Sequence, residues 1–164
     1  MNRDLIEQAR ALLEICRSKQ LKLATAESCT GGLVAGTLTE VAGCSDVVER
    51  GFVTYSNDAK QEMLGVSPSV LARHGAVSRE TARAMATGAI AHAPVALAVS
   101  VTGIAGPQGA TAEKPVGLVY FAAASRSGQL IDCERRYGDI GRAQVRHASV
   151  TQALALLREV AEKE

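Results

Sequence analysis

A serine in a glycine-rich turn is the residue of this 164-residue chain that is best placed for nucleophilic chemistry. Ser28 lies in residues 25–32, TAESCTGG, which close an apolar run and open a helical pattern. A sharp turn between a strand and a helix exposes a serine at the edge of the sheet, where a nucleophile can reach its substrate. The segment resembles a nucleophile elbow in this arrangement, although it lacks the G-x-S-x-G motif. Taken alone, the segment is more simply explained as a Ser/Thr cap before an ordinary helix.

A serine hydroxyl is a weak nucleophile until a base takes its proton, and Lys60 is the best candidate for that base. A lysine partly withdrawn from water loses proton affinity and can be neutral near physiological pH. Tyr55, five residues earlier, is placed to pass a proton between Ser28 and a leaving group. From spacing alone, a solvated lysine and a tyrosine packed at a strand end explain these positions equally well. The three histidines lie outside the loops that follow strands, so no Ser/His/Asp set is evident.

Two neighbours of Ser28 need roles of their own. Cys29 competes for the role of nucleophile, because a thiol at a helix N-terminus has a lowered pKa. Cysteine is also often a small buried hydrophobic residue, and no histidine partner is close in sequence, so Ser28 is preferred. Glu27 is expected to brace the turn through hydrogen bonds rather than act as an acid, because these loops hold no second carboxylate to raise its pKa.

The residues after Ser28 are candidates for binding a substrate. Gly31 and Gly32 let the backbone approach a ligand closely. The N–H groups of the first helical turn, starting near Thr30, then point at any negative charge there. We therefore expect Thr30, Gly31 and Gly32 to bind substrate and the local N–H groups to stabilise an oxyanion.

A second candidate binding segment is residues 102–107, TGIAGP. Thr102, Gly103 and Gly106 form a predicted backbone cradle that admits a ring or a phosphate, although a lone G-x-x-G is weak evidence against a simple loop. Arg142, near the start of the last predicted helix, is suited to bidentate contact with a phosphate. Arg146, one turn later, is equally suited, so the choice between the two arginines stays open.

Alternating helices and strands must position these residues. The sequence predicts an α/β fold, a three-layer α/β/α sandwich with a mixed, mostly parallel sheet and a hairpin at one side. The expected strands are 21–26, 48–55, 95–102, 116–124 and 129–137, and the expected helices are 4–18, 30–41, 57–64, 68–74, 78–92 and 141–163. Ligands bind outside the carboxyl ends of such strands, so the three polar loops share one pocket if their strands are parallel neighbours.

The composition excludes several classes of function. The 18 Lys+Arg and 17 Asp+Glu residues give a net charge of +1, and aromatic residues make up only 3%, so no nucleic acid partner is expected. Charges and glycines interrupt every apolar stretch, and the first residues are expected to enter an amphipathic helix, so neither a membrane partner nor a signal peptide is predicted. Four scattered cysteines without a CxxC pair predict no metal site, no disulfide framework and a reduced, cytoplasmic setting.

Five motifs occur in order along almost the whole chain: 25–32 TAESCTGG, 55–57 YSN with Lys60, 75–78 GAVS, 101–107 VTGIAGP and 113–117 EKPVG. Together they closely resemble the C-terminal domain family of the competence/damage-inducible protein CinA, which includes nicotinamide-nucleotide amidohydrolases. The resemblance implies one domain over residues 1–164 and an α/β/α fold. It also implies hydrolysis of nicotinamide mononucleotide to nicotinic acid mononucleotide and ammonia, in pyridine nucleotide salvage, without metal or organic cofactor.

The family's catalytic serine, tyrosine and lysine fall on Ser28, Tyr55 and Lys60, the residues already selected by their chemistry. Its late arginine falls most naturally on Arg142, but residues 138–142, GDIGR, carry two extra residues before it, so Arg146 stays possible. A second departure from the family pattern is Gln108, where glycine is common. The resemblance and the apolar helices also suggest a homodimer.

Two other functions stay open. The same pocket could bind a nucleotide without acting on it, as a module in competence or DNA-damage responses, because a retained fold does not guarantee catalysis. It could also hydrolyse another small amide. Ligand-induced stabilisation without ammonia release would favour the first alternative, and competition between substrates would reveal the second.

Overall fold

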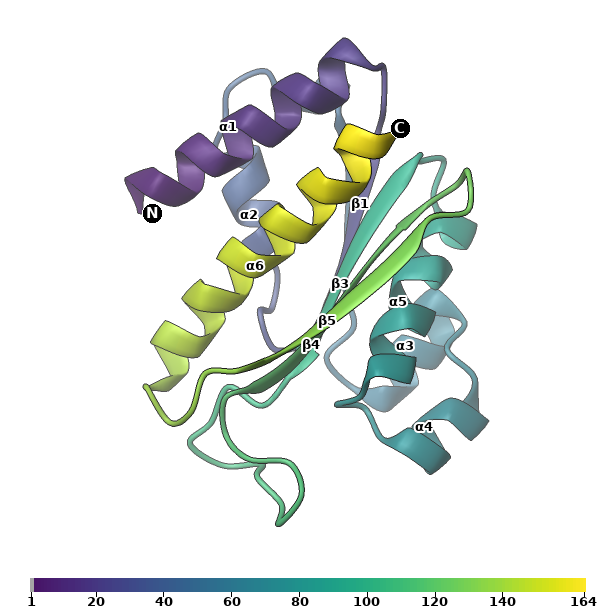
Figure 1. Ribbon diagram of the computed structural model, residues 1–164. Coiled ribbons are helices and arrows are strands. Elements are labelled where there is room, and N and C mark those ends of the chain that lie inside the picture. Colours follow the sequence, from purple (N-terminus) through teal and green to yellow (C-terminus); the bar gives the residue numbers. More distant parts are fainter. Residues whose placement is uncertain (1) are drawn as a thin grey trace.

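Five strands form one sheet between two layers of helices (Figure 1). The structure is a computed structural model that describes residues 2–164. In chain order the elements are α1 (Arg3–Ser18), β1 (Leu23–Glu27), α2 (Leu33–Thr39), the 3-10 helix η1 (Cys44–Asp46), β2 (Val48–Val53), α3 (Asn57–Leu64), α4 (Pro68–His74), α5 (Arg79–His92), β3 (Leu97–Gly103), β4 (Leu118–Ser125), β5 (Leu130–Arg136) and α6 (Arg142–Lys163).

The strand order is β2-β1-β3-β4-β5. β1 pairs in parallel with β2 and β3, whereas β4 is antiparallel to β3 and β5. β5 therefore points the same way as the first three strands, and only β4 runs against them. Glu27, at the end of β1, lies level with Val53 on β2 and Val101 on β3. The predicted α/β/α sandwich is confirmed, and the loops after β1, β2 and β3 leave the sheet at the same edge.

The two faces of the sheet have different packing. α1, α2 and α6 cover one face, and α3, α4 and α5 cover the other (Figure 1). Along β3, Val99 and Val101 pack in the cluster with α6, whereas Ala98 packs in the cluster with α5, as the two-residue period of a strand requires. Ser100 shares that second face and donates its hydroxyl to the carbonyl of Ala82 on α5 at 2.5 Å.

α3 packs close to α5 because of one glycine. A Cβ atom at Gly88 on α5 would overlap the carbonyl oxygen of Leu64 at the end of α3. Glycine weakens a helix interior relative to alanine, so this position exchanges helix propensity for a close approach between the two helices. The approach fixes the place of α3, which carries Lys60.

The predicted bounds differ from the structure mainly around the Ser28 turn. The helix expected over residues 30–41 begins only at Leu33, because Gly31 and Gly32 have positive φ angles of 57° and 100° that no right-handed helix accommodates. The η1 turn was not predicted. The helices at 57–64 and 68–74 are confirmed with the same bounds, each capped by a serine hydroxyl. None of the helices within residues 2–164 has the length and apolarity to cross a membrane.

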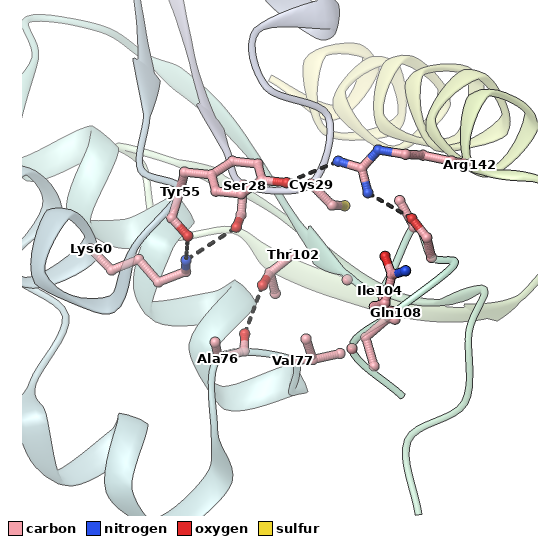
Figure 2. A pocket seen from close by; sticks show the side chains of 14 residues that line it. Ser28, Cys29, Tyr55, Lys60, Ala76, Val77, Thr102, Ile104, Gln108 and Arg142 are labelled. Atoms are coloured by element: carbon pink, nitrogen blue, oxygen red, sulfur yellow. Dashed lines mark hydrogen bonds between the residues drawn. The ribbon is translucent and has the colours of Figure 1, made fainter. Parts of the chain in front are cut away.

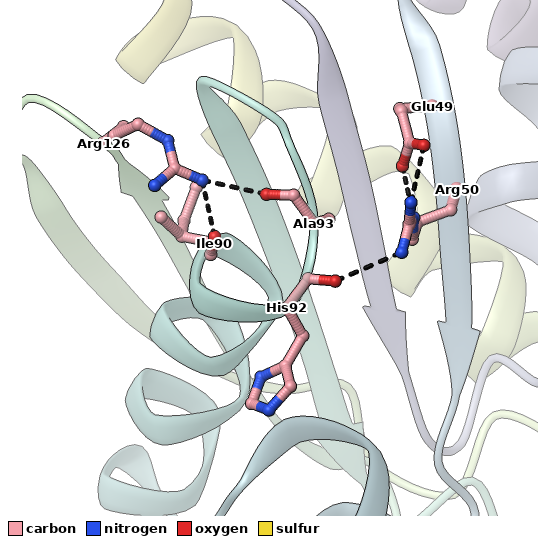
Figure 3. A network of polar contacts seen from close by, with 6 residues as sticks. All are labelled: Glu49, Arg50, Ile90, His92, Ala93 and Arg126. Carbon is pink, nitrogen blue, oxygen red and sulfur yellow. Dashed lines mark hydrogen bonds and ion pairs between the residues drawn. The ribbon is translucent and has the colours of Figure 1, made fainter.

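Two arginines fix the C-terminal end of α5 (Figure 3). This end lies at the edge of the sheet opposite the loops that follow β1, β2 and β3. Arg126, in the turn between β4 and β5, donates to the carbonyls of Ile90 and Ala93 at 2.6 and 2.8 Å. Arg50, on β2, donates to the carbonyl of His92 at 3.2 Å. The last carbonyls of a helix have no partner inside the helix. These guanidinium groups supply that partner and hold α5 firmly against the amino-terminal ends of the strands.

Candidate active site

The loops after β1, β2 and β3 enclose a pocket of about 230 Å³ (Figure 2). The predicted convergence of the three loops is therefore observed. The pocket is lined by Ser28, Cys29, Tyr55, Lys60, Ala76, Val77, Thr102, Gly103, Ile104, Ala105, Gly106, Gln108, Gly109 and Arg142. The residues at 76–77 and 108–109 had no predicted role in the site, although the GAVS motif includes the first two.

Ser28 and Lys60 meet at the base of this pocket. Lys60 Nζ lies 3.1 Å from Ser28 Oγ, and it donates to the carbonyl of Tyr55 at 3.3 Å (Figure 2). It also donates to the carbonyl of Thr54 at 2.9 Å. Lys60 is only 1% exposed, and Ser28 is 8% exposed. Burial lowers the pKa of Lys60 below its ordinary value of 10.5, and the nearby Cys29 opposes that shift in part. A neutral amine at this position can take the serine proton across the same contact.

The local sequence explains why Lys60 points inward. The Ser56 hydroxyl accepts a hydrogen bond from the N–H of Ala59 at 2.9 Å and so caps the N-terminus of α3. Lys60 follows in the first turn of this helix. α3 then lies on the α5 side of the sheet, where Leu64, one turn later, is also buried. Lys60 and Leu64 occupy the same helix face, and that face is turned to the sheet.

The turn after β1 is fixed by backbone hydrogen bonds. The Ser28 N–H donates to the Val101 carbonyl on β3 at 2.9 Å, and the Gly31 N–H returns to the Ser28 carbonyl at 3.0 Å. Within residues 2–164, the N–H groups of Cys29 and Thr30 donate to no other residue. They are the free donors closest in sequence to the Ser28 hydroxyl, which is the property an oxyanion site needs.

Glu27 braces this turn, as predicted. Its carboxylate accepts hydrogen bonds from the N–H groups of Val34 and Ala35, at 2.8 and 3.1 Å, in the first turn of α2. The side chain is 1% exposed, and Thr25 also donates to it at 3.3 Å. Gly32 precedes α2 without a side-chain cap, so Glu27 satisfies donors that the helix start leaves free.

Replacing Glu27 with alanine should destabilise the protein. The Glu27→Ala change leaves two N–H donors of α2 unpaired, one buried and one partly buried, so we expect the free energy of unfolding to fall by about 2–3 kcal/mol. Urea denaturation measures this loss. Glu27→Gln keeps one carbonyl oxygen as an acceptor and should lose less. An unchanged free energy of unfolding in Glu27→Ala would show that the carboxylate does not brace α2.

Cys29 is a poor candidate for the nucleophile in this environment. Its side chain is 5% exposed, and burial raises the pKa of the thiol to about 12. The nearby Arg146 and Lys60 lower it by less than burial raises it. The thiolate is the reactive form of cysteine, and this position disfavours it. The preference for Ser28 over Cys29 therefore has a physical basis in the structure.

We expect the Cys29→Ala protein to keep its kcat within about threefold of wild type, because the buried thiol is not ionised near neutral pH. The change removes one buried sulfur atom and should cost about 1 kcal/mol of stability. Steady-state kinetics of the purified variant measure the first effect, and urea denaturation measures the second. Loss of turnover in a folded Cys29→Ala protein would transfer the nucleophile role to the thiol.

Tyr55 and Arg142 meet at the mouth of the pocket (Figure 2). Arg142 donates to the Tyr55 hydroxyl at 3.0 Å and to the Gly106 carbonyl at 2.7 Å. The Tyr55 side chain is largely exposed, and its hydroxyl makes no hydrogen bond with Ser28 or Lys60 in residues 2–164. The contact between Tyr55 and Lys60 is instead through the Tyr55 backbone carbonyl. Tyr55 thus lies in the site without a direct route for a proton from its hydroxyl to Ser28.

Arg142 and Arg146 occupy different places. Arg142 lines the pocket, and Arg146 does not. Arg146 Nε donates to the Cys29 carbonyl at 3.1 Å, and its Nη2 donates to the Thr30 carbonyl at 3.2 Å. The guanidinium of Arg146 therefore holds the Ser28 turn, and Arg142 is the arginine that faces the space available to a ligand.

Thr30, Gly31 and Gly32 lie in the turn beside the pocket but outside its lining. The Thr30 side chain is fully buried, and its hydroxyl has no hydrogen-bond partner in the described part of the chain. The two glycines have left-handed φ angles, which a side chain would strain. Their glycine identity thus serves the shape of the turn.

Thr102, Gly103 and Gly106 all line the pocket. The Thr102 hydroxyl donates to the Ala76 carbonyl at 2.7 Å and so ties the 75–78 loop to the end of β3 (Figure 2). A Cβ atom at Gly103 would lie 2.8 Å from the Leu118 carbonyl oxygen. Packing against β4 is therefore a sufficient reason for glycine at that position. No histidine lines the pocket, and residues 2–164 hold no group of three or more His, Cys, Asp or Glu side chains arranged for a metal.

Comparison with known proteins identifies the family. Residues 6–161 match the family model described as the CinA C-terminal domain. The chain is 48% identical over 134 residues to the Enterobacter agglomerans protein named nicotinamide-nucleotide amidohydrolase PncC, a match that covers 82% of each chain. It is 45% identical over 159 residues to a Caldicellulosiruptor bescii relative, but it spans only 38% of that protein's length.

Solved structures agree with this match. The crystal structure of the competence/damage inducible protein CihA from Agrobacterium tumefaciens superposes with a TM-score of 0.96 at 53% identity, covering 98% of this chain and 97% of that one. A CinA superfamily protein from Klebsiella pneumoniae superposes with a TM-score of 0.92 at 32% identity, with both chains fully covered. The family-model match, the sequence identity and the superposition all extend over most of the chain, so the chain belongs to the CinA C-terminal domain family.

Proposed function

We propose that this chain hydrolyses the carboxamide of nicotinamide mononucleotide to nicotinic acid mononucleotide and ammonia. The observation that carries the proposal is the 3.1 Å contact between Ser28 Oγ and the buried Lys60 Nζ at the base of the pocket. A serine paired with a lysine of lowered pKa is suited to acyl transfer. The substrate follows from the name of the Enterobacter agglomerans relative, which this chain matches over most of its length.

In the proposed mechanism, neutral Lys60 takes the Ser28 proton while Ser28 Oγ attacks the carboxamide carbon. The N–H groups of Cys29 and Thr30 stabilise the oxyanion, at about 3–4 kcal/mol per donor in enzymes that use such sites. Collapse of the tetrahedral intermediate breaks the C–N bond, and Lys60 returns the proton to the leaving nitrogen, which departs as ammonia. Lys60 then activates water, which hydrolyses the acyl-enzyme and regenerates Ser28.

Arg142 is the proposed anchor for the nucleotide phosphate. It is the exposed cation of the pocket mouth, and its guanidinium already forms a bridge between Tyr55 and Gly106. Guanidinium groups bind phosphate oxygens in pairs, with hydrogen bonds stronger than those between neutral groups. Tyr55 has an indirect part in this scheme, because its hydroxyl orients Arg142.

Ammonia release from nicotinamide mononucleotide by the purified wild-type protein tests the proposal. Release with equal formation of nicotinic acid mononucleotide would support it. Thermal stabilisation by the nucleotide without ammonia release would favour the non-catalytic nucleotide-binding module. Release from other small amides at a higher kcat/KM than from nicotinamide mononucleotide would assign a different substrate to the same chemistry.

The pH dependence of kcat/KM should report the buried lysine. Protonated Lys60 has no lone pair for the serine proton, so the rate should rise as the pH rises through the Lys60 pKa and then level off. Burial lowers that pKa, so the apparent pKa should fall below 10.5. Initial rates measured across alkaline buffers of equal ionic strength give the profile. A profile without this rise, or an apparent pKa at the ordinary value, would contradict a buried lysine base.

A further inference from the structure

We propose that Arg146 is a positioning residue for the reaction, and this assignment rests on the proposed function. Its guanidinium holds the peptide groups on either side of Thr30, so that the Thr30 N–H keeps one orientation. Arg146 acts on the reaction through these peptide groups, without itself contacting the substrate.

The two hydrogen bonds of Arg146 reach consecutive carbonyls of the same turn. Nε binds the Cys29 oxygen at 3.1 Å and Nη2 binds the Thr30 oxygen at 3.2 Å. The C=O and N–H of a trans peptide point in opposite directions. A guanidinium on the Cys29 oxygen therefore directs the Thr30 N–H away from α6. That N–H is one of the two free donors described above, and its orientation depends on what holds the opposite end of its peptide group.

Within residues 2–164, the hydrogen bond from Arg146 is the one that holds the peptide group between Cys29 and Thr30. Gly31 and Gly32 follow Thr30, and glycine populates positive and negative φ values about equally. These glycines therefore add little steric restraint to the turn. The next peptide group, between Thr30 and Gly31, is held by backbone hydrogen bonds from the Gly31 N–H to the Ser28 carbonyl and from the Leu33 N–H to the Thr30 carbonyl, and the Arg146 contact to the Thr30 oxygen adds to them.

The position of Arg146 in α6 distinguishes it from Arg142. Val145, which precedes Arg146, and Ser149, three residues after Arg146, are both fully buried. This part of α6 is therefore fixed against the sheet. Arg146 itself is half-buried and absent from the pocket lining, whereas Arg142 is exposed and lines the pocket. Arg146 is therefore placed to stabilise the active conformation of the turn, and Arg142 to contact the ligand.

The test compares the kinetics of Arg146→Met and Arg146→Lys with those of wild type. Arg146→Met removes both donors and should lower kcat by about tenfold to a hundredfold, with KM within about twofold; this is at or below the roughly 10²- to 10³-fold loss for removing an oxyanion donor, because the Thr30 N–H is misoriented and not removed. Arg146→Lys keeps a positive donor that reaches one carbonyl at a time, so its kcat should lie between those of wild type and Arg146→Met. Both are assayed well below their unfolding temperatures, with the folded fraction measured by circular dichroism.

Arg126→Met is the matched control. Arg126 also donates to backbone carbonyls, but at the far edge of the sheet: those of Ile90 and Ala93 (Figure 3). It donates to the carbonyl of Val95 as well. Its loss should lower the unfolding temperature and leave kcat within about twofold of wild type. A general loss of stability would affect Arg126→Met and Arg146→Met alike, whereas a positioning role predicts a lower kcat only at Arg146.

Three results would overturn the assignment. A kcat within twofold of wild type in Arg146→Met would show that the turn does not need the clamp. A rise in KM with unchanged kcat would make Arg146 a ligand-binding residue. An equal loss of kcat in Arg126→Met would make the effect one of stability. Wild-type protein that releases no ammonia would instead overturn the proposed function, and this assignment with it.

Discussion

Replacing Ser28 with alanine is expected to lower kcat for nicotinamide mononucleotide by about 10³-fold or more while the protein stays folded. The change removes one hydroxyl oxygen from a residue that is 8% exposed, and it leaves the backbone hydrogen bond from Ser28 to Val101 intact. The proposed acyl-enzyme cannot form without that oxygen. Ammonia release measured beside the wild type gives the loss, and circular dichroism checks the fold.

Ser18→Ala is the control for this experiment, because Ser18 ends α1 at an exposed position outside the pocket lining. That variant should turn over at the wild-type rate. The Ser28→Ala protein should still be stabilised by nicotinamide mononucleotide in a thermal shift assay, since Arg142 and the 102–106 loop are untouched. Wild-type turnover in a folded Ser28→Ala protein would contradict a mechanism in which Ser28 is the nucleophile.

Lys60→Met should also remove turnover, by about 10²- to 10⁴-fold, the usual contribution of a general base. Methionine is also unbranched and nearly as long as lysine, so it fills most of the same buried space, but it has no nitrogen to take the Ser28 proton. Arg142 and the 102–106 loop stay in place, so nucleotide binding should persist. Initial rates of ammonia release measure the loss. Lys22→Met, at an exposed site, is the matched control and should leave the rate unchanged.

The same variant should change the pH dependence of stability. The folded pKa of Lys60 lies below its ordinary value of 10.5, so the unfolded chain binds this proton more tightly than the folded chain does. Wild-type stability should therefore rise as the pH increases from the folded pKa toward 10.5, and fall as the pH decreases over that range. Urea denaturation at several pH values should show this slope in wild type and not in Lys60→Met. Equal slopes would mean that Lys60 is not the group whose proton is displaced by folding.

The place of the site was predictable because three apolar runs each end in a polar loop. Ser28, Tyr55 and Thr102 follow such runs, and parallel neighbours bring their carboxyl ends to one edge. The burial of Lys60 was not predictable. Its helix is otherwise polar on either side, with Asp58 and Glu62 near it, and such a lysine is commonly solvated. What buries it is the close packing of α3 on α5 and the turn at Ser28, both of which are tertiary contacts.

The two arginines show a second limit of sequence information. Arg142 and Arg146 are four residues apart, so they share one face of α6 and differ by about one helical turn of 5.4 Å. The spacing alone does not distinguish which of the two arginines reaches a phosphate. The angle at which α6 crosses the turn after β1 decides the outcome, and it places Arg146 on the backbone of the turn and Arg142 at the pocket. That angle depends on core packing over the full length of the helix.

Because α6 supplies both arginines, the chemistry of this protein is tied to the order in which the chain is synthesised. The serine and the lysine leave the ribosome more than eighty residues before Arg142, yet the turn that holds the serine stays unclamped until α6 docks. A nascent or truncated chain without α6 lacks both arginines and the buried core residues of that helix, so it should not hydrolyse nicotinamide mononucleotide. Hydrolysis should begin only when the last helix has packed against the sheet, so the appearance of activity marks completed folding.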